Sequence, residues 1–217
     1  MDKDYHHIDI LYIDCLLTKY DKLFKKYIKL LPKKTVEKIA RFRRQKDREM
    51  FLYANLLLIK GLSQYGYPED CLYHISQGKY GRPYIDPKVD FNVSRSGSFV
   101  VCALTRNGKV GIDIERIKPI DLHIYKRVFN SNEWEIITSS EDSLSTFYSY
   151  WTIKESVLKA DGRGFFVDPL NVKNDQEVAF LEGKKWYLNK ITVSREYCCY
   201  LASNLKKPMI LIGKAII

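Results

Sequence analysis

The order of predicted strands and helices repeats along this chain, and that repeat constrains the fold more than any other feature. IDILYID, near residue 10, alternates apolar and polar residues, as a half-buried strand does. A long helical stretch begins near residue 33 and strands follow it, and the second half again shows helices followed by strands. The sequence therefore predicts an α+β fold of two similar lobes, residues 1–109 and 110–217.

Within the first lobe, the helical stretch is too long for one ordinary helix, so we expect two helices that meet near residues 44–47. A strand pair should follow, formed by FNVSRSGSFVVCALT and RNGKVGIDIE. Arg106, Asn107 and Gly108 would form its turn, because Asn-Gly between apolar runs is a strong hairpin signal.

Within the second lobe, Ser131 or Asn132 would cap a helix over NSNEWEIITS. A second helix, STFYSYWTIKESVLKADG, should end at Gly162, since glycine commonly ends helices. The strands that complete the lobe are expected at KWYLNKITV, YCCYLAS and MILIGKAII.

The charge balance narrows the class of partner. Lys and Arg outnumber Asp and Glu by 36 to 26, which gives a net charge of +10. Such a surplus favours an anionic partner: nucleic acid, a phosphorylated small molecule, an acidic protein or an anionic membrane surface.

The cysteines and the N-terminal segment indicate the cellular compartment of the protein. The five cysteines are odd in number and lack CxxC spacing, which favours reduced core thiols over a zinc site or disulfide framework. The N-terminal segment is polar and acidic, unlike a secretory signal, and no apolar run is long enough to span a bilayer. We therefore expect a soluble cytoplasmic protein.

Carboxylates alternate with isoleucines in VGIDIE. Asp113 and Glu115 share one face of the predicted strand, while Ile112 and Ile114 face the core. Two carboxylates this close repel each other unless a cation or protons compensate. A simple solvated strand face is the alternative interpretation.

The helix WTIKESVLKADG supplies a third carboxylate. Trp151, Glu155 and Lys159 are spaced four apart and so line one helix face. Glu155 and Lys159 could be an ordinary surface pair. If Glu155 instead meets Asp113 and Glu115, the three acids form an all-oxygen site of the kind that binds Mg²⁺ and recruits phosphate oxygens.

Several motifs together resemble a known family. FNVSRSG, VGIDIE and WTIKESVLKADGRGF, in this order, resemble the signature of the 4′-phosphopantetheinyl transferases, in the two-lobed bacterial type that activates surfactin-like peptide synthetases. YGRPYI and ARFRRQKDREMF resemble further segments of that family, so the resemblance spans roughly residues 30 to 170. It implies two pseudo-twofold-related α+β lobes with the active site in the cleft between them.

The resemblance also implies the reaction and the residues that perform it. Coenzyme A would donate its phosphopantetheine arm to a serine of a carrier protein, releasing adenosine 3′,5′-bisphosphate. By position, Asp113, Glu115 and Glu155 resemble the Mg²⁺ ligands, and Asp113, Glu155 and Lys159 the catalytic residues. Residues that resemble the coenzyme A contacts are Lys38, Arg48, Arg82, Ser94, Arg95, Lys154 and Lys159.

One of these contacts departs from the family pattern. Ser94 and Arg95, helped by Arg82, would meet the 3′-phosphate of coenzyme A, and the family usually has His where Arg95 stands. A guanidinium holds phosphate bidentately and stays charged at every relevant pH. We expect binding to survive the change. Either Glu155 or water polarised by the metal would deprotonate the carrier serine, and the sequence leaves both open.

The resemblance implies an acidic helical bundle as the partner, an acyl or peptidyl carrier protein, with no nucleic acid or membrane involved. The two-lobed length favours a monomer. The aromatic residues that could receive an apolar carrier helix, or form ordinary core, are Phe129, Trp134, Phe147 and Tyr148.

Two alternatives remain. RFRRQKDR and the +10 charge suit a basic nucleic-acid-binding module without catalysis, although no zinc-finger spacing or RRM-like motif accompanies them. A non-catalytic family member acting as a scaffold is the other alternative, weakened by the presence of all three acids and Lys159.

Overall fold

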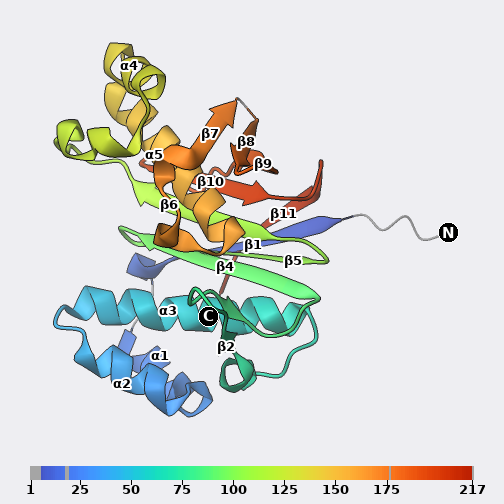
Figure 1. Ribbon diagram of the computed structural model, residues 1–217. Coiled ribbons are helices and arrows are strands. Elements are labelled where there is room, and N and C mark those ends of the chain that lie inside the picture. Colours follow the sequence, from blue (N-terminus) through green and yellow to red (C-terminus); the bar gives the residue numbers. More distant parts are fainter. Residues whose placement is uncertain (1–5, 18–19, 176, 217) are drawn as a thin grey trace.

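Four layers build this protein: helices, two β-sheets, and a second layer of helices (Figure 1). The computed structural model describes residues 6–17, 20–175 and 177–216. The first sheet has the strand order β11-β1-β5-β4 and the second has the order β6-β10-β9-β8-β7. The α+β architecture predicted from the sequence is confirmed.

The strands have the following bounds. The first sheet contains β1 (His7–Asp14), β4 (Val89–Ser96), β5 (Phe99–Arg106) and β11 (Met209–Lys214). The second contains β6 (Val110–Arg116), β7 (Val172–Asp175), β8 (Val178–Leu181), β9 (Lys184–Lys190) and β10 (Tyr197–Ser203). A separate two-stranded sheet pairs β2 (Ser76–Gln77) with β3 (Pro83–Tyr84).

The helices fall into two groups along the chain. Those on the first sheet are α1 (Tyr20–Tyr27), α2 (Lys33–Arg41) and α3 (Gln45–Gln64), and those of the second half are α4 (Ser131–Ser139) and α5 (Ser143–Asp161). The 3₁₀ turns are η1 (Cys15–Leu17), η2 (Ile28–Leu30), η3 (Cys71–His74), η4 (Leu122–Val128), η5 (Gly164–Phe166) and η6 (Pro169–Asn171).

Helix α3 forms the core of the first half against the sheet. Its fully buried side chains include Tyr53, Leu57 and Leu62, which pack with Leu104 of β5. The prediction of two helices meeting near residues 44–47 is confirmed, because α2 ends at Arg41 and α3 begins at Gln45.

The predicted Asn-Gly hairpin is wrong. Asn107 does turn the chain, with a φ of 53°, but β5 and β6 belong to different sheets. The hairpin of this region lies earlier, where β4 and β5 pair antiparallel around Gly97 and Ser98. The physical reason is burial: the apolar residues of β6 pack between the two sheets while β6 itself pairs with β10.

The helix ends in the second half differ in part from expectation. The cap of α4 is Asn130, and neither Ser131 nor Asn132, because Asn130 and Glu133 form a reciprocal capping box. Helix α5 ends at Gly162 as predicted, and this glycine adopts a left-handed φ of 87°.

The last strand returns to the first half of the molecule. β11 runs parallel to β1, with Ile210 opposite Ile8 and Ile212 opposite Ile10. The first sheet therefore draws strands from both ends of the chain, and the C-terminal segment lies near α3 (Figure 1).

Two further expectations concerned the state of the cysteines and the presence of a membrane-spanning helix. Cys71, Cys102, Cys198 and Cys199 are buried and form no disulfide, and Cys15 is buried as well. Among the residues that the structure describes, no helix has both the length and the apolarity that a bilayer crossing requires.

Candidate active site

Side chains of β4 join the two sheets by capping main-chain groups of β6. Every second residue of β4 offers an oxygen that accepts a hydrogen bond from a β6 N–H, because residues i and i+2 of a strand share a face. The pairs are Asp90 with Val110 (2.8 Å), Asn92 with Ile112 (2.9 Å), Ser94 with Ile114 (3.4 Å) and Ser96 with Arg116 (3.0 Å). This register brings Ser94 to Asp113 and Ser96 to Glu115.

Asp113 is the centre of a three-residue polar cluster. Its Oδ1 accepts hydrogen bonds from Lys159 Nζ at 2.6 Å and from Ser94 Oγ at 2.9 Å, and Lys159 Nζ lies 2.9 Å from Ser94 Oγ. Only 3% of Asp113 is exposed, so these charges interact in a poorly solvated environment. Its other oxygen, Oδ2, is buried and has no hydrogen-bond partner among the residues that the structure describes.

Two more carboxylates share a cavity of about 370 Å³ with Asp113. Burial and the nearby negative charge of Asp113 raise the pKa of Glu155 to about 7, although Lys159 opposes the shift. Burial also raises the pKa of Glu115, while the hydrogen bond that Ser96 donates at 2.7 Å acts in the other direction. Repulsion between these acids would be relieved by a cation.

The three carboxylates are suitable ligands for a hard divalent cation, although their oxygens do not point at one common position. In the described part of the chain, no three His, Cys, Asp or Glu side chains form a group that could hold a metal ion as they stand. Asp113 has an unpartnered buried oxygen, and Glu115 and Glu155 line the same cavity. Carboxylate oxygens are the ligands that Mg²⁺ prefers. The residues present are therefore of the right type for this ion.

A second cavity adjoins the first. It lies between α2, α3 and β4 and has a volume of about 720 Å³. Ser94 and Arg95 line both cavities, so the two spaces meet at β4. Lys34 and Asn55 contribute further polar groups, and the Arg95 guanidinium lies 5.6 Å from the ring centroid of Phe51.

Four of the predicted coenzyme A contacts, Lys38, Arg48, Arg82 and Lys154, line neither cavity. Lys38 Nζ lies 4.7 Å from the ring centroid of Phe51, and Arg48 donates to the carbonyl of Phe42 at 2.8 Å. Arg82 donates to Asp90 at 2.6 Å and to the carbonyl of Val110 at 2.8 Å, which ties the β2–β3 region to the junction between the sheets.

Lys154 is also engaged elsewhere, in the interior. Its Nζ lies 3.0 Å from Glu133 Oε2 and donates to the carbonyls of Pro169 and Val172. Burial lowers the pKa of Lys154, and the negative charge of Glu133 opposes that shift. This pair connects α5 to α4 and to η6, and the structure does not bring it to the cavity.

Replacing Lys154 with methionine is expected to lower the free energy of unfolding by about 3 kcal/mol, because it leaves Glu133 buried without its cation. Urea unfolding measures the loss. The double variant Lys154→Met/Glu133→Gln should recover much of it, since no unpaired charge remains. A folded Lys154→Met enzyme with a strongly raised KM for coenzyme A would instead support the sequence-based assignment.

Two features of the site have no role predicted from the sequence. Trp151 lines the carboxylate cavity and also a third cavity beside Ile124 and Pro169, and its spacing from Glu155 was the available signal. The hydrogen-bond acceptors of β4 could have been found from the alternation in DFNVSRS.

The aromatic candidates have the role of core residues. Phe129, Phe147 and Tyr148 are buried, and their rings form edge-to-face contacts in one cluster, against which Trp134 packs. Ile124, beside this cluster in η4, is instead 69% exposed.

Comparison with known proteins gives two adjoining family matches. Residues 19–107 match the N-terminal domain described as "4′-phosphopantetheinyl transferase, N-terminal", and residues 109–202 match the 4′-phosphopantetheinyl transferase superfamily. Similar proteins include the 4′-phosphopantetheinyl transferase gsp of Aneurinibacillus migulanus, 38% identical over 70% of this chain and 67% of its own length. The 4′-phosphopantetheinyl transferase Sfp of Bacillus subtilis (strain 168) is 30% identical over 77% of this chain and 76% of its length.

Proposed function

Because this chain belongs to the 4′-phosphopantetheinyl transferase superfamily, we propose that Asp113, Glu155 and Lys159 are its catalytic residues and that its cleft loads carrier proteins from coenzyme A. The enzyme transfers the 4′-phosphopantetheine group of coenzyme A to a carrier protein. The acceptor is a serine hydroxyl, and adenosine 3′,5′-bisphosphate leaves.

The observation that supports this assignment most strongly is the Ser94–Asp113–Lys159 cluster at the meeting point of two cavities. One cavity lies beside the three carboxylates and the other extends between α2 and α3. A diphosphate ester with a long arm on each side needs this arrangement: charged groups at the reacting phosphorus and separate space for the nucleotide. Ser94 and Arg95 border both spaces and would contact the phosphates.

Asp113, Glu115 and Glu155 would hold the Mg²⁺ that the family typically uses. Bound there, Mg²⁺ supplies Lewis-acid polarisation and offsets the charge of the pyrophosphate. Lys159 Nζ adds a positive charge 2.6 Å from Asp113 and would neutralise charge that develops on the leaving phosphate. Asp113 orients Lys159 in turn, and Ser94 fixes both side chains.

Glu155 is suited to accept the proton of the carrier serine. Burial together with Asp113 raises the pKa of Glu155 to about 7 in the metal-free protein, and a cation bound beside it would favour the ionised carboxylate that a general base needs. The Glu155 carboxylate and Lys159 line the same cavity. One face of α5 would therefore supply both the group that accepts the serine proton and the cation that binds the phosphate. Water beside the carboxylates is the alternative base.

Replacing Glu155 with glutamine is expected to stabilise the metal-free protein while lowering transfer activity. The pKa of Glu155 is raised from 4.5 to about 7 on folding, so its ionisation costs stability increasingly as pH rises between these values. The variant should therefore gain little at pH 4.5 and up to about 2 kcal/mol above pH 7. Urea unfolding in the presence of a chelator measures this. An identical difference at both pH values would contradict the assigned pKa shift.

The division of labour between the lobes follows from the same placement. Residues 1–109 would bind the nucleotide and 3′-phosphate, and residues 110–217 would carry the carboxylates and Lys159. The cavity beside Trp151 and the exposed Ile124 offers an apolar place for the carrier next to the reacting groups. We expect a monomer that acts in the cytoplasm.

Incubation with coenzyme A, Mg²⁺ and a panel of apo-carriers tests the function directly. Intact-protein mass spectrometry should show the carrier gaining one phosphopantetheine group, and a chelator should abolish the gain. The proposal would be overturned if the enzyme loaded none of the apo-carriers under conditions where the family member gsp loads them.

A further inference from the structure

The positive charge of this chain is concentrated in one short segment. Residues 20–49, here called the basic cap, contain twelve Lys and Arg against four Asp and Glu. The basic cap therefore carries a net charge of +8, out of +10 for the whole chain. The rest of the molecule is close to neutral, so any anionic surface is attracted to one side of the protein.

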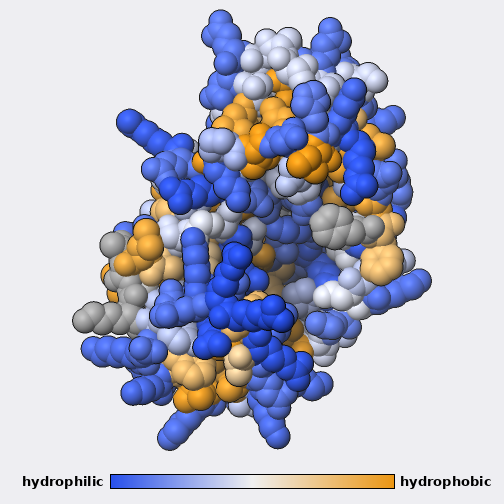
Figure 2. Space-filling view, turned by 90° about the vertical axis from the view of Figure 1, so that its left-hand side faces the viewer, coloured by the Kyte–Doolittle hydropathy of each residue, from blue (hydrophilic) through white to orange (hydrophobic). Residues whose placement is uncertain are grey.

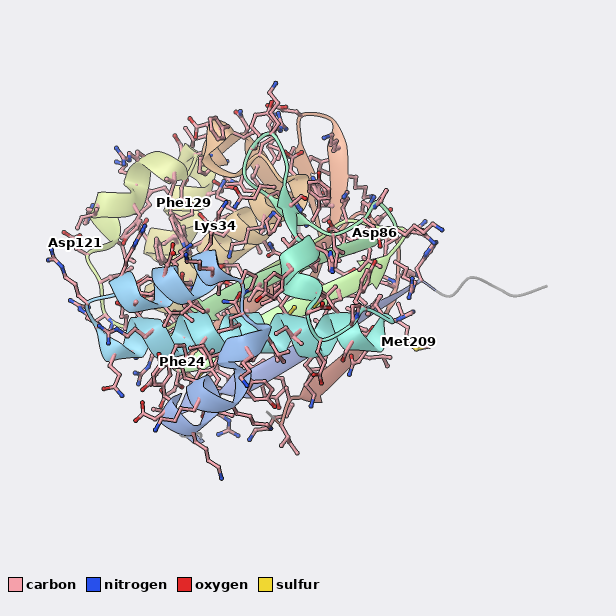
Figure 3. The ribbon with its side chains drawn as sticks, turned by 90° about the horizontal axis from the view of Figure 1, so that it is seen from below. Phe24, Lys34, Asp86, Asp121, Phe129 and Met209 are labelled. Atoms are coloured by element: carbon pink, nitrogen blue, oxygen red, sulfur yellow. The ribbon has the colours of Figure 1, made fainter. Side chains whose placement is uncertain are left out.

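The basic cap comprises α1, η2, α2 and the start of α3. Seen from below, these helices form the outer layer in front of the first sheet (Figure 3). Eleven of its twelve cationic residues are exposed, and within the described ranges none forms an ion pair. Unpaired exposed cations contribute little to folding, which leaves them available to a partner.

Coenzyme A alone does not require so many cations. Its three phosphate groups would need only a few, and of the cap residues only Lys34 adds a cation to the lining of the larger cavity. The other eleven cap cations are absent from that lining, and four of them, Lys22, Lys25, Lys26 and Lys29, lie on α1 and η2, which contribute nothing to it. Their number and spread suit a macromolecular surface.

The position of the basic cap favours the carrier protein as that partner. Lys34 and Thr35 of α2 line the cavity that meets the catalytic cluster at Ser94, so the cap borders the cleft. The space-filling view shows long hydrophilic side chains over the lower lobe, alongside a hollow between the lobes (Figure 2). A partner held there would lie beside the cleft that its serine must enter.

The basic cap lacks the aromatic stacking surface that single-stranded nucleic acid uses. Single-stranded nucleic acid is bound by stacking of bases on aromatic rings. The aromatic residues of α1, Tyr20, Phe24 and Tyr27, instead pack against the protein core, and Tyr20 and Phe24 stack on each other. The surface offers charge without stacking platforms.

We propose that the basic cap is an electrostatic docking surface for the acidic face of the carrier protein, in addition to the cleft itself. This inference rests on the proposed carrier-loading function. Its effect is on encounter and weak binding, because exposed charges act mainly on association rates and are screened by salt. The chemical step inside the cleft is unaffected.

A fourfold charge-neutralised variant tests the proposal: Lys22→Gln, Lys25→Gln, Lys29→Gln and Arg43→Gln. All four are exposed, and none lines any of the three cavities described above. The matched control removes four exposed cations elsewhere: Lys173→Gln, Arg195→Gln, Lys206→Gln and Lys214→Gln. Both variants have the same net charge, so only the location of the lost charge differs.

Loading of an acidic apo-carrier is then measured at about 10 mM and about 200 mM salt, where screening differs strongly. The cap variant should show about a tenfold higher KM for the carrier at low salt, with kcat and the KM for coenzyme A unchanged. The control variant should change less than twofold. At high salt the difference between the variants should shrink.

The outcomes separate this proposal from the one it rests on. If the wild-type enzyme loads no carrier, the proposed function fails. If it does load the carrier but the cap and control variants have the same KM, the docking surface is wrong. If the cap variant loses only affinity for a DNA or RNA duplex, with carrier kinetics unchanged, the basic cap serves nucleic acid and the proposal is overturned.

Discussion

Asp113→Ala is expected to lower kcat/KM for carrier loading by about a thousandfold. The change removes a metal-binding carboxylate, including the buried Oδ2 that has no partner in the described part of the protein. It also removes the acceptor that positions Lys159 at 2.6 Å and Ser94 at 2.9 Å. Three contributions are lost at once, because one side chain connects the proposed metal site to the phosphate-binding lysine.

Asp113→Asn is the matched control for this loss. An asparagine oxygen can still accept the hydrogen bonds from Ser94 and Lys159, so the packing is kept while the charge is removed. If metal binding is the main contribution, both variants should lose activity to a similar extent, and both should bind Mn²⁺ more weakly in a direct titration. Wild-type activity of either variant at limiting Mg²⁺ would refute the metal assignment.

Gly111→Ala is expected to cost at least about 4 kcal/mol of stability, which is a large fraction of the stability that folded proteins typically have. A Cβ at Gly111 would overlap the backbone of α5, at the carbonyl of Ser156 and the main-chain nitrogen of Ala160. Helix α5 packs directly on β6 at this point and cannot move away without displacing Glu155 and Lys159. Backbone atoms cannot move aside as a flexible side chain can, so the overlap can be removed only by shifting the whole helix.

Gly213→Ala provides the comparison, because Gly213 also lies in a strand. A Cβ there would meet only Leu11 Cδ2 at 3.7 Å, an ordinary van der Waals contact. Urea unfolding should therefore show little change for Gly213→Ala and a much lower midpoint for Gly111→Ala. Equal stability of the two variants would mean that α5 does not lie as close to β6 as described.

Much of the fold could be predicted because local patterns agree with the tertiary structure. The apolar spacing in residues 33–64 is that of α2 and α3, and the break between them falls where the pattern weakens. Ile112 and Ile114 are fully buried, as the alternation in VGIDIE predicts. The alternation did not reveal what covers the opposite face, which is α5 and not solvent.

Predictions from short motifs were wrong where a segment far away in the sequence provides the strand partner or the ion-pair partner. Asn107-Gly108 reads as a hairpin turn, yet β6 pairs with β10, which lies more than eighty residues further along the chain. Arg82 and Lys154 were predicted to contact coenzyme A because of their positions in the family motifs. In the structure, buried Asp90 and Glu133 accept them as ion-pair partners. A charge is retained in the interior only when such a partner is present, and no short motif reveals that partner.

The sequence by itself determined the α+β class, the helix and strand periodicities and the set of acids and lysines that the chemistry needs. These follow from side-chain spacing, since period 2 and period 3.6 place residues on faces without reference to the rest of the chain. Only the tertiary structure decided which face meets which: that β4 oxygens cap β6, that Lys159 contacts Asp113, and that Lys154 is buried with Glu133. Such choices depend on burial and on competition between groups far apart in the chain, which no local pattern records.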